Sequence, residues 1–191
     1  MSREPVGILL AAGRSSRFGS HKLTHKLPGT QTPIAVQAAS HLLAAVPNSV
    51  AVVRDGDQQL IELLSETGID IATNNHADLG ISRSLCCGIS TRSEAFAWVV
   101  ALADMPFVPP RIIEQVSRAL KKGALLAAPE YNGQRGHPVG FSHKLMKELL
   151  QLQGDVGAKT IVDKHRNDLQ LIQVTDKAIL RDIDKTGDLH E

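Results

Sequence analysis

Short apolar runs alternate along the chain with longer segments in which apolar residues recur every three or four positions. The short runs have the length and composition of buried strands, and they cover residues 6–12, 49–54, 69–73, 95–103, 124–129 and 169–174. Helical spacing follows at residues 33–46, 58–66, 110–122 and 142–151, with a further small-residue helix within 74–90. Residues 130–141 predict a turn and a hairpin. This alternation predicts an α/β fold, a Rossmann-like three-layer arrangement with a mostly parallel sheet.

The chain shows no internal repeat, no low-complexity segment and no linker-like stretch. Its 191 residues are enough to bury one hydrophobic core of ordinary size. We therefore expect residues 1–191 to form a single domain.

Composition and charge argue against several classes of binding partner. Basic and acidic residues nearly balance, at 21 against 20, and aromatic residues make up 3% of the chain. A basic face for nucleic acid and stacking platforms for single strands are therefore not expected. The N-terminal apolar run is too short to span a membrane. The two cysteines, Cys86 and Cys87, are adjacent and form no disulfide framework, which favours the cytoplasm.

The loop after the first strand, "AAGRSSRFGSHK", combines small, hydroxylated and cationic residues. Ligands of open α/β sheets bind beyond the carboxyl ends of the strands, which is where this loop begins. Backbone N–H groups freed by Gly13 and Gly19, together with cations, can cradle phosphate. Neither a Walker loop nor G-x-G-x-x-G is present. The loop therefore predicts a phosphate site, the alternative being a glycine-rich turn whose basic residues are only solvated.

Carboxylates follow two of the predicted strands. Asp104 comes directly after the most apolar strand, where a hard oxygen ligand suits Mg²⁺; a cap for the following turn is the alternative. Asp182 and Asp184 are two residues apart and point to the same side if the backbone is extended. Either could instead cap a C-terminal helix, and Asp188 is expected at the surface.

Six sequence blocks, taken together, resemble the molybdenum cofactor cytidylyltransferase family of nucleotidyltransferases. "LLAAGRSSRFGSHKL" is similar to its signature L-A-A-G-x-S-x-R-x-G-x-x-K. The others are "NNHADLGISRSLCCGI", "ALADMPFV", "GQRGHPVGF", "GDVGAK" and "DIDKTGDL", in the family's order and over nearly the whole chain. Lys159 stands where the family usually has arginine, and the last block lacks the usual Pro-Glu.

The resemblance implies a GT-A-like nucleotidyltransferase fold and a role for each matching position. Catalytic roles would fall to Arg17, Lys22 and Asp104, and Mg²⁺ would be held by Asp104 with one of Asp182 or Asp184, preferably Asp184. Nucleotide-binding positions would be Leu10, Ala11, Ala12, Gly13, Arg14, Ser15, Lys22, Asn74, Ser82 and Ser84. Acceptor-binding positions would be His137, Asp155 and Lys159. The alternatives are helix capping for the serines and Asn74, and no function for His137.

The implied reaction transfers CMP from CTP to a phosphorylated pterin, the molybdopterin-type acceptor, and releases pyrophosphate. The form "LAAG" resembles the cytidylyl members, whereas guanylyl members usually read Leu-Ala-Gly-Gly. Guanylyl transfer, and transfer to sugar phosphates, methylerythritol phosphate or phosphocholine, are the alternatives within enzymes. Another alternative is a non-catalytic accessory protein that assists molybdoenzyme maturation. A molybdoenzyme or accessory protein is a possible partner.

Overall fold

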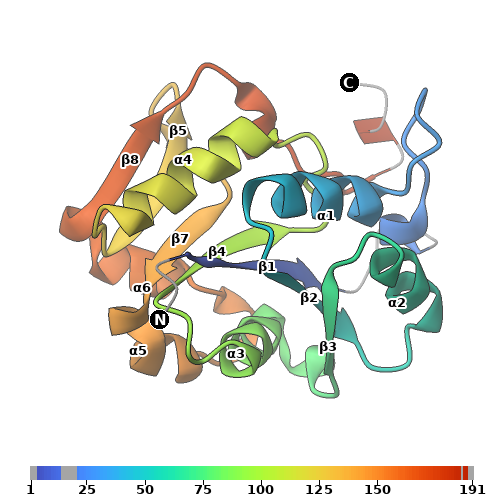
Figure 1. Cartoon of the computed structure of the whole chain (residues 1–191), viewed down its shortest axis with the longest axis horizontal. Helices are drawn as coiled ribbons and strands as arrows, with labels where there is room; N and C mark the ends of the chain where they lie inside the picture. The colour runs from blue at the N-terminus through green and yellow to red at the C-terminus, as the bar shows by residue number, and fades with distance from the viewer. Residues whose placement is uncertain (1–3, 14–20, 186, 189–191) are drawn as a thin grey trace.

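The fold centres on a mixed sheet, seen edge-on in Figure 1. The computed structural model describes residues 4–13, 21–185 and 187–188. Within these ranges eight strands form one sheet, in the order β3-β2-β1-β4-β7-β5-β6, with β8 beside β5. The strands are β1 (Val6–Ala11), β2 (Ser49–Arg54), β3 (Asp70–Asn74), β4 (Ala97–Leu102), β5 (Leu126–Tyr131), β6 (Gln134–Arg135), β7 (Val139–Ser142) and β8 (Leu169–Gln173).

The strands on either side of β1 run parallel to it. β1 lies between β2 and β4, with Ile8 opposite Val50 on one side and Val100 on the other. β2 also pairs in parallel with β3, so the carboxyl ends of β1, β2, β3 and β4 share one edge of the sheet; β7 runs antiparallel between β4 and β5. The prediction of an α/β fold with a mostly parallel sheet is confirmed.

The predicted hairpin joins β5 to β6. Tyr131 pairs with Gln134, which leaves Asn132 and Gly133 as a two-residue turn. Both have positive φ, 49° and 78°, a conformation that asparagine and glycine tolerate better than other residues. The chain then continues into β7 on the same side of β5, opposite β8, and this path places His137 between β6 and β7.

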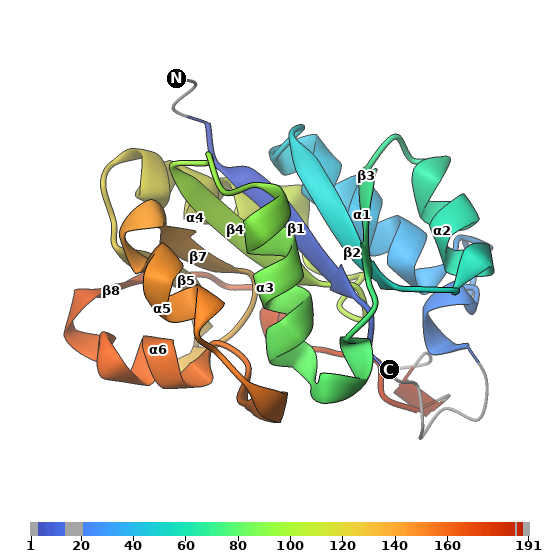
Figure 2. The same cartoon turned by 90° about the horizontal axis from the view of Figure 1, so that it is seen from below.

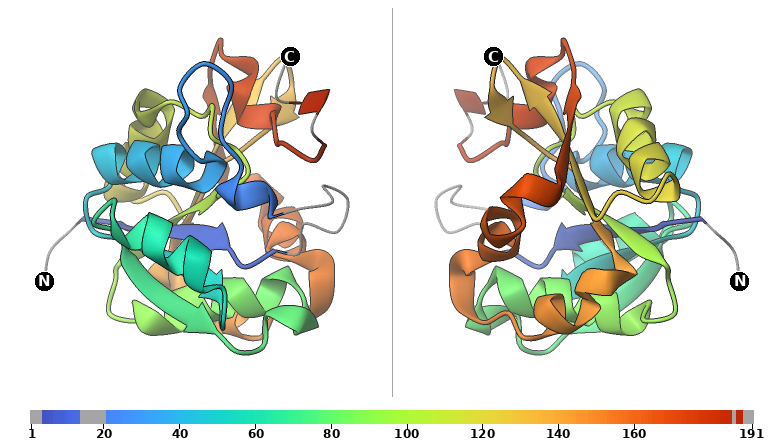
Figure 3. Two further views of the ribbon diagram at one scale, coloured as in Figure 1. Left: turned by 90° about the vertical axis from the view of Figure 1, so that its right-hand side faces the viewer. Right: turned by 90° about the vertical axis from the view of Figure 1, so that its left-hand side faces the viewer.

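Helices cover both faces of the sheet and make the three layers (Figures 1 and 2). One face carries α1 (Ile34–Ala45), α2 (Gln58–Ser65) and α4 (Pro110–Lys121). The other carries α3 (Ile81–Thr91), α5 (Met146–Leu150) and α6 (Lys159–Lys164). Two views from opposite sides show the sheet enclosed between them (Figure 3).

Successive side chains along each strand point to opposite faces of the sheet, so the hydrophobic core has two parts. Leu9 packs with the α1 and α4 side, whereas its neighbour Ile8 packs with the α3 side. Trp98 on β4 is fully buried, and its indole N–H donates to the carbonyl of Arg92 at 3.0 Å. Full burial of such a side chain contributes about 1.5–3 kcal/mol relative to exposure.

Residues 142–151 are not the continuous helix that their spacing predicts. Phe141 pairs with Trp98, so the sheet holds the chain extended as far as Ser142. The Ser142 hydroxyl then accepts from the N–H of Lys144 and caps a 3-10 turn, His143–Leu145. The α-helix proper begins at Met146.

In the described part of the chain, no helix combines the length and the apolar character needed to cross a membrane.

Candidate active site

A pocket of about 470 Å³ opens at the carboxyl edge of the sheet. We call it the first pocket. Its walls come from the ends of β1, β2 and β4, the start of α3, and two later loops. It is lined by Leu10, Ala12, Gly13, Lys22, Leu23, Arg54, Ala77, Asp78, Gly80, Ile81, Ser84, Leu102, Asp104, Asp155 and Asp184.

A second pocket of about 300 Å³ adjoins the first. Most of its wall is aliphatic or aromatic, with Val139 and Phe141 of β7 on one side and Val162 of α6 on another. Its polar groups are Arg135, His137, Asp155 and Lys159. Leu10, Ile81, Leu102 and Asp155 line both pockets, so a molecule in one lies beside a molecule in the other.

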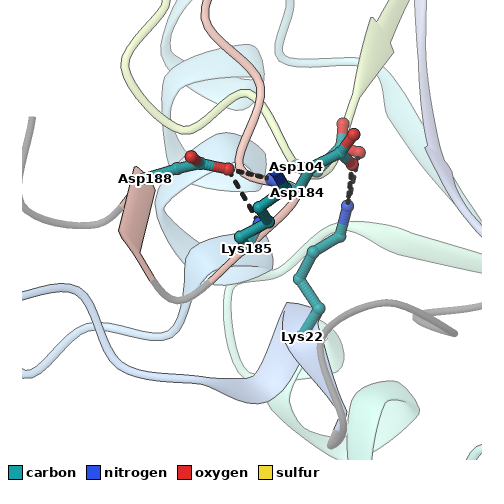
Figure 4. A network of polar contacts seen from close by, with 5 residues as sticks. All are labelled: Lys22, Asp104, Asp184, Lys185 and Asp188. Atoms are coloured by element: carbon teal, nitrogen blue, oxygen red, sulfur yellow. Dashed lines mark hydrogen bonds and ion pairs between the residues drawn. The ribbon is translucent and has the colours of Figure 1, made fainter.

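Lys22 meets two carboxylates in the first pocket (Figure 4). Its Nζ lies 2.9 Å from Oδ2 of Asp104 and 3.3 Å from Oδ1 of Asp184. Burial alone would lower the pKa of the Lys22 ammonium, but the two carboxylates outweigh burial and raise the pKa above its ordinary value. Lys22 is therefore cationic at neutral pH.

Three carboxylates gather around this lysine. One oxygen each from Asp104, Asp182 and Asp184 lie within 4.8 Å of one another. Partial desolvation raises the pKa of Asp182, and the neighbouring carboxylates of Asp184 and Asp104 raise it further. A set of hard oxygen donors this close together fits Mg²⁺ or Mn²⁺.

The segment that carries Asp184 is fastened to the segment that carries Asp104. The N–H of Ile183 donates to the carbonyl of Asp104 at 2.9 Å, and the Ile183 side chain is fully buried. Asp188 lies beside them. Its Oδ2 accepts from the backbone N–H groups of Asp184 at 2.8 Å and Lys185 at 2.7 Å (Figure 4). The expectation of a plain surface role for Asp188 missed these two bonds.

Gly80, at the start of α3, brings the two later loops together. Its φ of +102° is in a region that favours glycine. A Cβ built there would lie 2.4 Å from backbone atoms of Gly154 and 2.6 Å from Oδ1 of Asp155. Only glycine permits this approach, and it places Asp155 at the boundary of the two pockets.

The predicted nucleotide-binding residues divide into three groups. Leu10, Ala12, Gly13, Lys22 and Ser84 line the first pocket. Ala11, Asn74 and Ser82 are buried and line neither pocket. Arg14, Ser15 and Arg17 lie outside the described residues, so their roles stay predictions.

Asn74 does not line the first pocket but forms hydrogen bonds to residues beside it. Its side-chain oxygen accepts from the N–H of His76 at 2.9 Å, and its amide donates to Oγ of Ser84 at 3.1 Å. It thereby ties the end of β3 to α3. Ser82 is fully buried, and its Oγ has no hydrogen-bond partner among the described residues.

The predicted acceptor-binding residues line the second pocket. His137, Asp155 and Lys159 all contribute to its wall. Burial lowers the pKa of His137 to about 4, with help from the positive charge of Arg135, so the ring is neutral at pH 7. Its Nδ1 is buried and has no hydrogen-bond partner among the described residues.

Sequence reasoning missed Arg54 and Asp78. The two form an ion pair at the wall of the first pocket, and Arg54 also donates to the carbonyl of Ala12 at 3.4 Å. Arg54 is the last residue of β2, and the rule that ligands bind beyond strand ends could have found it.

Sequence comparisons match this chain to a family model and to curated relatives. The family model described as the MobA-like NTP transferase domain matches residues 7–169. The bifunctional protein GlmU of Thermus thermophilus is 27% identical over 156 residues, covering 80% of this chain and 33% of that protein. A probable molybdenum cofactor guanylyltransferase of Chloroflexus aggregans is 28% identical over 112 residues, covering 59% and 51%. The chain thus spans about a third to a half of these relatives.

Solved structures agree on the fold. Rv0371c of Mycobacterium tuberculosis superposes with a TM-score of 0.81 at 23% identity, covering 97% of this chain and 95% of that one. A second structure of Rv0371c, with a TM-score of 0.75 at 22% identity, is a complex with manganese and covers 91% and 89%.

Proposed function

Because the chain belongs to the MobA-like NTP transferase family, and is thus a nucleotidyltransferase, we propose that it transfers CMP from CTP to a phosphorylated, pterin-type acceptor. Pyrophosphate is the second product. The carrying observation is the pair of adjoining pockets, one with the Lys22–carboxylate cluster and one largely apolar.

The first pocket suits the nucleoside triphosphate. The strand order β3-β2-β1-β4 sets its polar groups in a row, from the Arg54–Asp78 pair at β2 to the carboxylates after β4. Strands are about 4.8 Å apart, so two intervals span about 10 Å, close to the reach from a base to its phosphates. The base would lie toward Arg54, and the phosphates toward Lys22.

The second pocket suits the acceptor. Its apolar walls suit a flat ring, and the neutral His137 is part of its lining. Arg135 and Lys159 supply positive charge for a phosphate. In the proposed reaction an oxygen of that phosphate attacks the α-phosphorus of the nucleotide in line, and the bond to the β-phosphate oxygen breaks.

Lys22 and the carboxylates handle the charge of this step. Asp104 and Asp184 would hold Mg²⁺, which supplies charge neutralisation when bound. Lys22, which is cationic and lines the same pocket, would neutralise negative charge that develops on the phosphate oxygens. Phosphoryl-type transfer needs mostly positioning and such neutralisation, so no general base is assigned.

GTP is the second candidate donor, because curated relatives of this chain bear the name molybdenum cofactor guanylyltransferase. CTP is proposed first because Ala12, which lines the first pocket, carries a methyl group where guanylyl members usually have glycine. A larger purine would meet that methyl group first.

The test is a reaction of the protein with each of the four triphosphates, molybdopterin and Mg²⁺. Pyrophosphate release and the mass of the product are both measured. CTP-dependent release with a cytosine dinucleotide product supports the proposal, and Asp104→Asn is the control for contaminating activity. Pyrophosphate release with GTP alone overturns the choice of CTP. If none of the four triphosphates gives pyrophosphate release, the proposed function is overturned.

A further inference from the structure

We propose that Asp188 is a positioning residue that fixes the carboxylate of Asp184 for metal binding. The inference rests on the proposed function, since it concerns the metal role assigned there to Asp184. Asp188 itself is absent from the residues that line either pocket, so it acts through the backbone.

The contacts of Asp188 are directed at the residue they would position. One oxygen, Oδ2, accepts from the N–H of Asp184 and from that of Lys185, at 2.8 and 2.7 Å. Two short bonds to consecutive peptides fix the backbone orientation on which the Asp184 side chain depends (Figure 4).

Asp188 is in turn held from behind. The guanidinium of Arg181 donates from Nη2 to the carbonyl oxygen of Asp188 at 2.9 Å. The same guanidinium lies over the ring of Phe107, with Cζ 4.1 Å from the ring centroid. Phe107 follows Asp104 by three residues, so this contact ties the Asp188 end of the segment to the Asp104 loop.

The Asp184 segment is therefore fixed on both sides. On one side, the N–H of Ile183 bonds to the carbonyl of Asp104. On the other, Asp188 holds the N–H of Asp184 itself. Without Asp188 the first tie remains, but the carboxylate of Asp184 can turn away from Asp104. Outer hydrogen bonds of this kind typically change metal affinity by about 10–100-fold.

The experiment measures Mn²⁺ affinity of the full chain without nucleotide, by the electron paramagnetic resonance of free Mn²⁺, and the melting temperature of each variant. Asp188→Ala should bind Mn²⁺ about 10–100-fold more weakly than the parent. Asp188→Asn should stay close to the parent, because its amide oxygen can accept the same two bonds. Asp163→Ala is the control, an exposed aspartate of α6 outside both pockets.

The outcomes separate this inference from the proposed function. Parent-like Mn²⁺ binding by Asp188→Ala, with Asp184→Asn weakened, overturns the inference alone. Equal weakening in Asp188→Asn and Asp188→Ala also overturns it, because charge rather than hydrogen bonding then matters. No Mn²⁺ binding by the parent removes the metal site of the proposed function and this inference with it. Should Asp188→Ala fail to fold, Asp188→Leu, similar to aspartate in shape, replaces it.

Discussion

Lys22 and Asp104 form an ion pair of 2.9 Å across 82 residues of sequence. The lysine side chain is 11% exposed and the aspartate 26%, so water screens the pair only in part. The contact brings the loop after β1 against the loop after β4.

Lys22→Met should lower both turnover and stability. Without the ammonium, the carboxylates of Asp104 and Asp184 face each other, and we expect a loss of about 1.5–3 kcal/mol in the free energy of unfolding. Added Mg²⁺ should raise the melting temperature of this variant more than that of the parent. Lys164→Met, which breaks an exposed pair with Glu148, is the control and should cost less than about 1 kcal/mol. An unchanged melt for Lys22→Met would contradict the expectation.

Asp104→Asn should reduce turnover by about 100-fold or more, the usual effect of removing one group that stabilises charge. Asp184→Asn should do the same, whereas Asp182→Asn should have a smaller effect because only Asp104 and Asp184 pair with Lys22. Steady-state pyrophosphate release at saturating Mg²⁺ measures all three. The assignment of the acids is wrong if Asp182→Asn proves the most damaging.

Lowering the pH should destabilise the fold through His137. Its pKa is about 4 in the folded protein and near 6.5 when unfolded, so between these values the unfolded chain binds more protons. This contribution to stability is complete above pH 6.5 and declines as the pH falls toward 4, by about 3 kcal/mol in all.

Urea unfolding at several pH values measures this effect. His137→Gln should flatten the slope between pH 6.5 and 4 relative to the parent. A parent-like slope in His137→Gln would assign the pH dependence to other groups.

Ala12→Gly should relax the choice of donor toward GTP. Steric discrimination by one methyl group is typically worth about 1–3 kcal/mol, or roughly 10–200-fold. Competition between equal CTP and GTP, read by product mass, measures the ratio for parent and variant. A ratio that Ala12→Gly leaves unchanged would exclude this methyl group as the cause of base choice.

Much of the fold could be predicted because burial leaves a local pattern. The runs that became β1, β2 and β4 are apolar and bounded by glycine, proline or polar residues, so their ends fell within a residue or two of those predicted. α6 was not predicted, since its six residues follow "GDVGA" and bury only Ile161 and Val162. The pairing of β7 with β5 continues the predicted hairpin, whereas its pairing with β4 joins distant segments and leaves no local signal.

The site divides in the same way. Lys22, Asp104 and Asp184 could be proposed from motif resemblance, and the structure brings them into contact. Arg54, Asp78 and Asp188 look like ordinary surface charges in the sequence. Arg54 and Asp78 pair across 24 residues of sequence, and Asp188 accepts from the backbone of a turn. Neither relationship leaves a spacing pattern in the sequence.

The two carboxylates that meet at Lys22 have a consequence for biosynthesis. Asp184 follows Lys22 by 162 residues, and Asp104 follows it by 82. A nascent chain that has emerged from the ribosome as far as β7 can already pair β1 with β4 and bring Lys22 to Asp104. The second acid reaches them only after a further stretch of translation. During that interval the growing chain holds Lys22 and Asp104 but lacks Asp184, so the metal role proposed for Asp184 implies that turnover begins only late in synthesis.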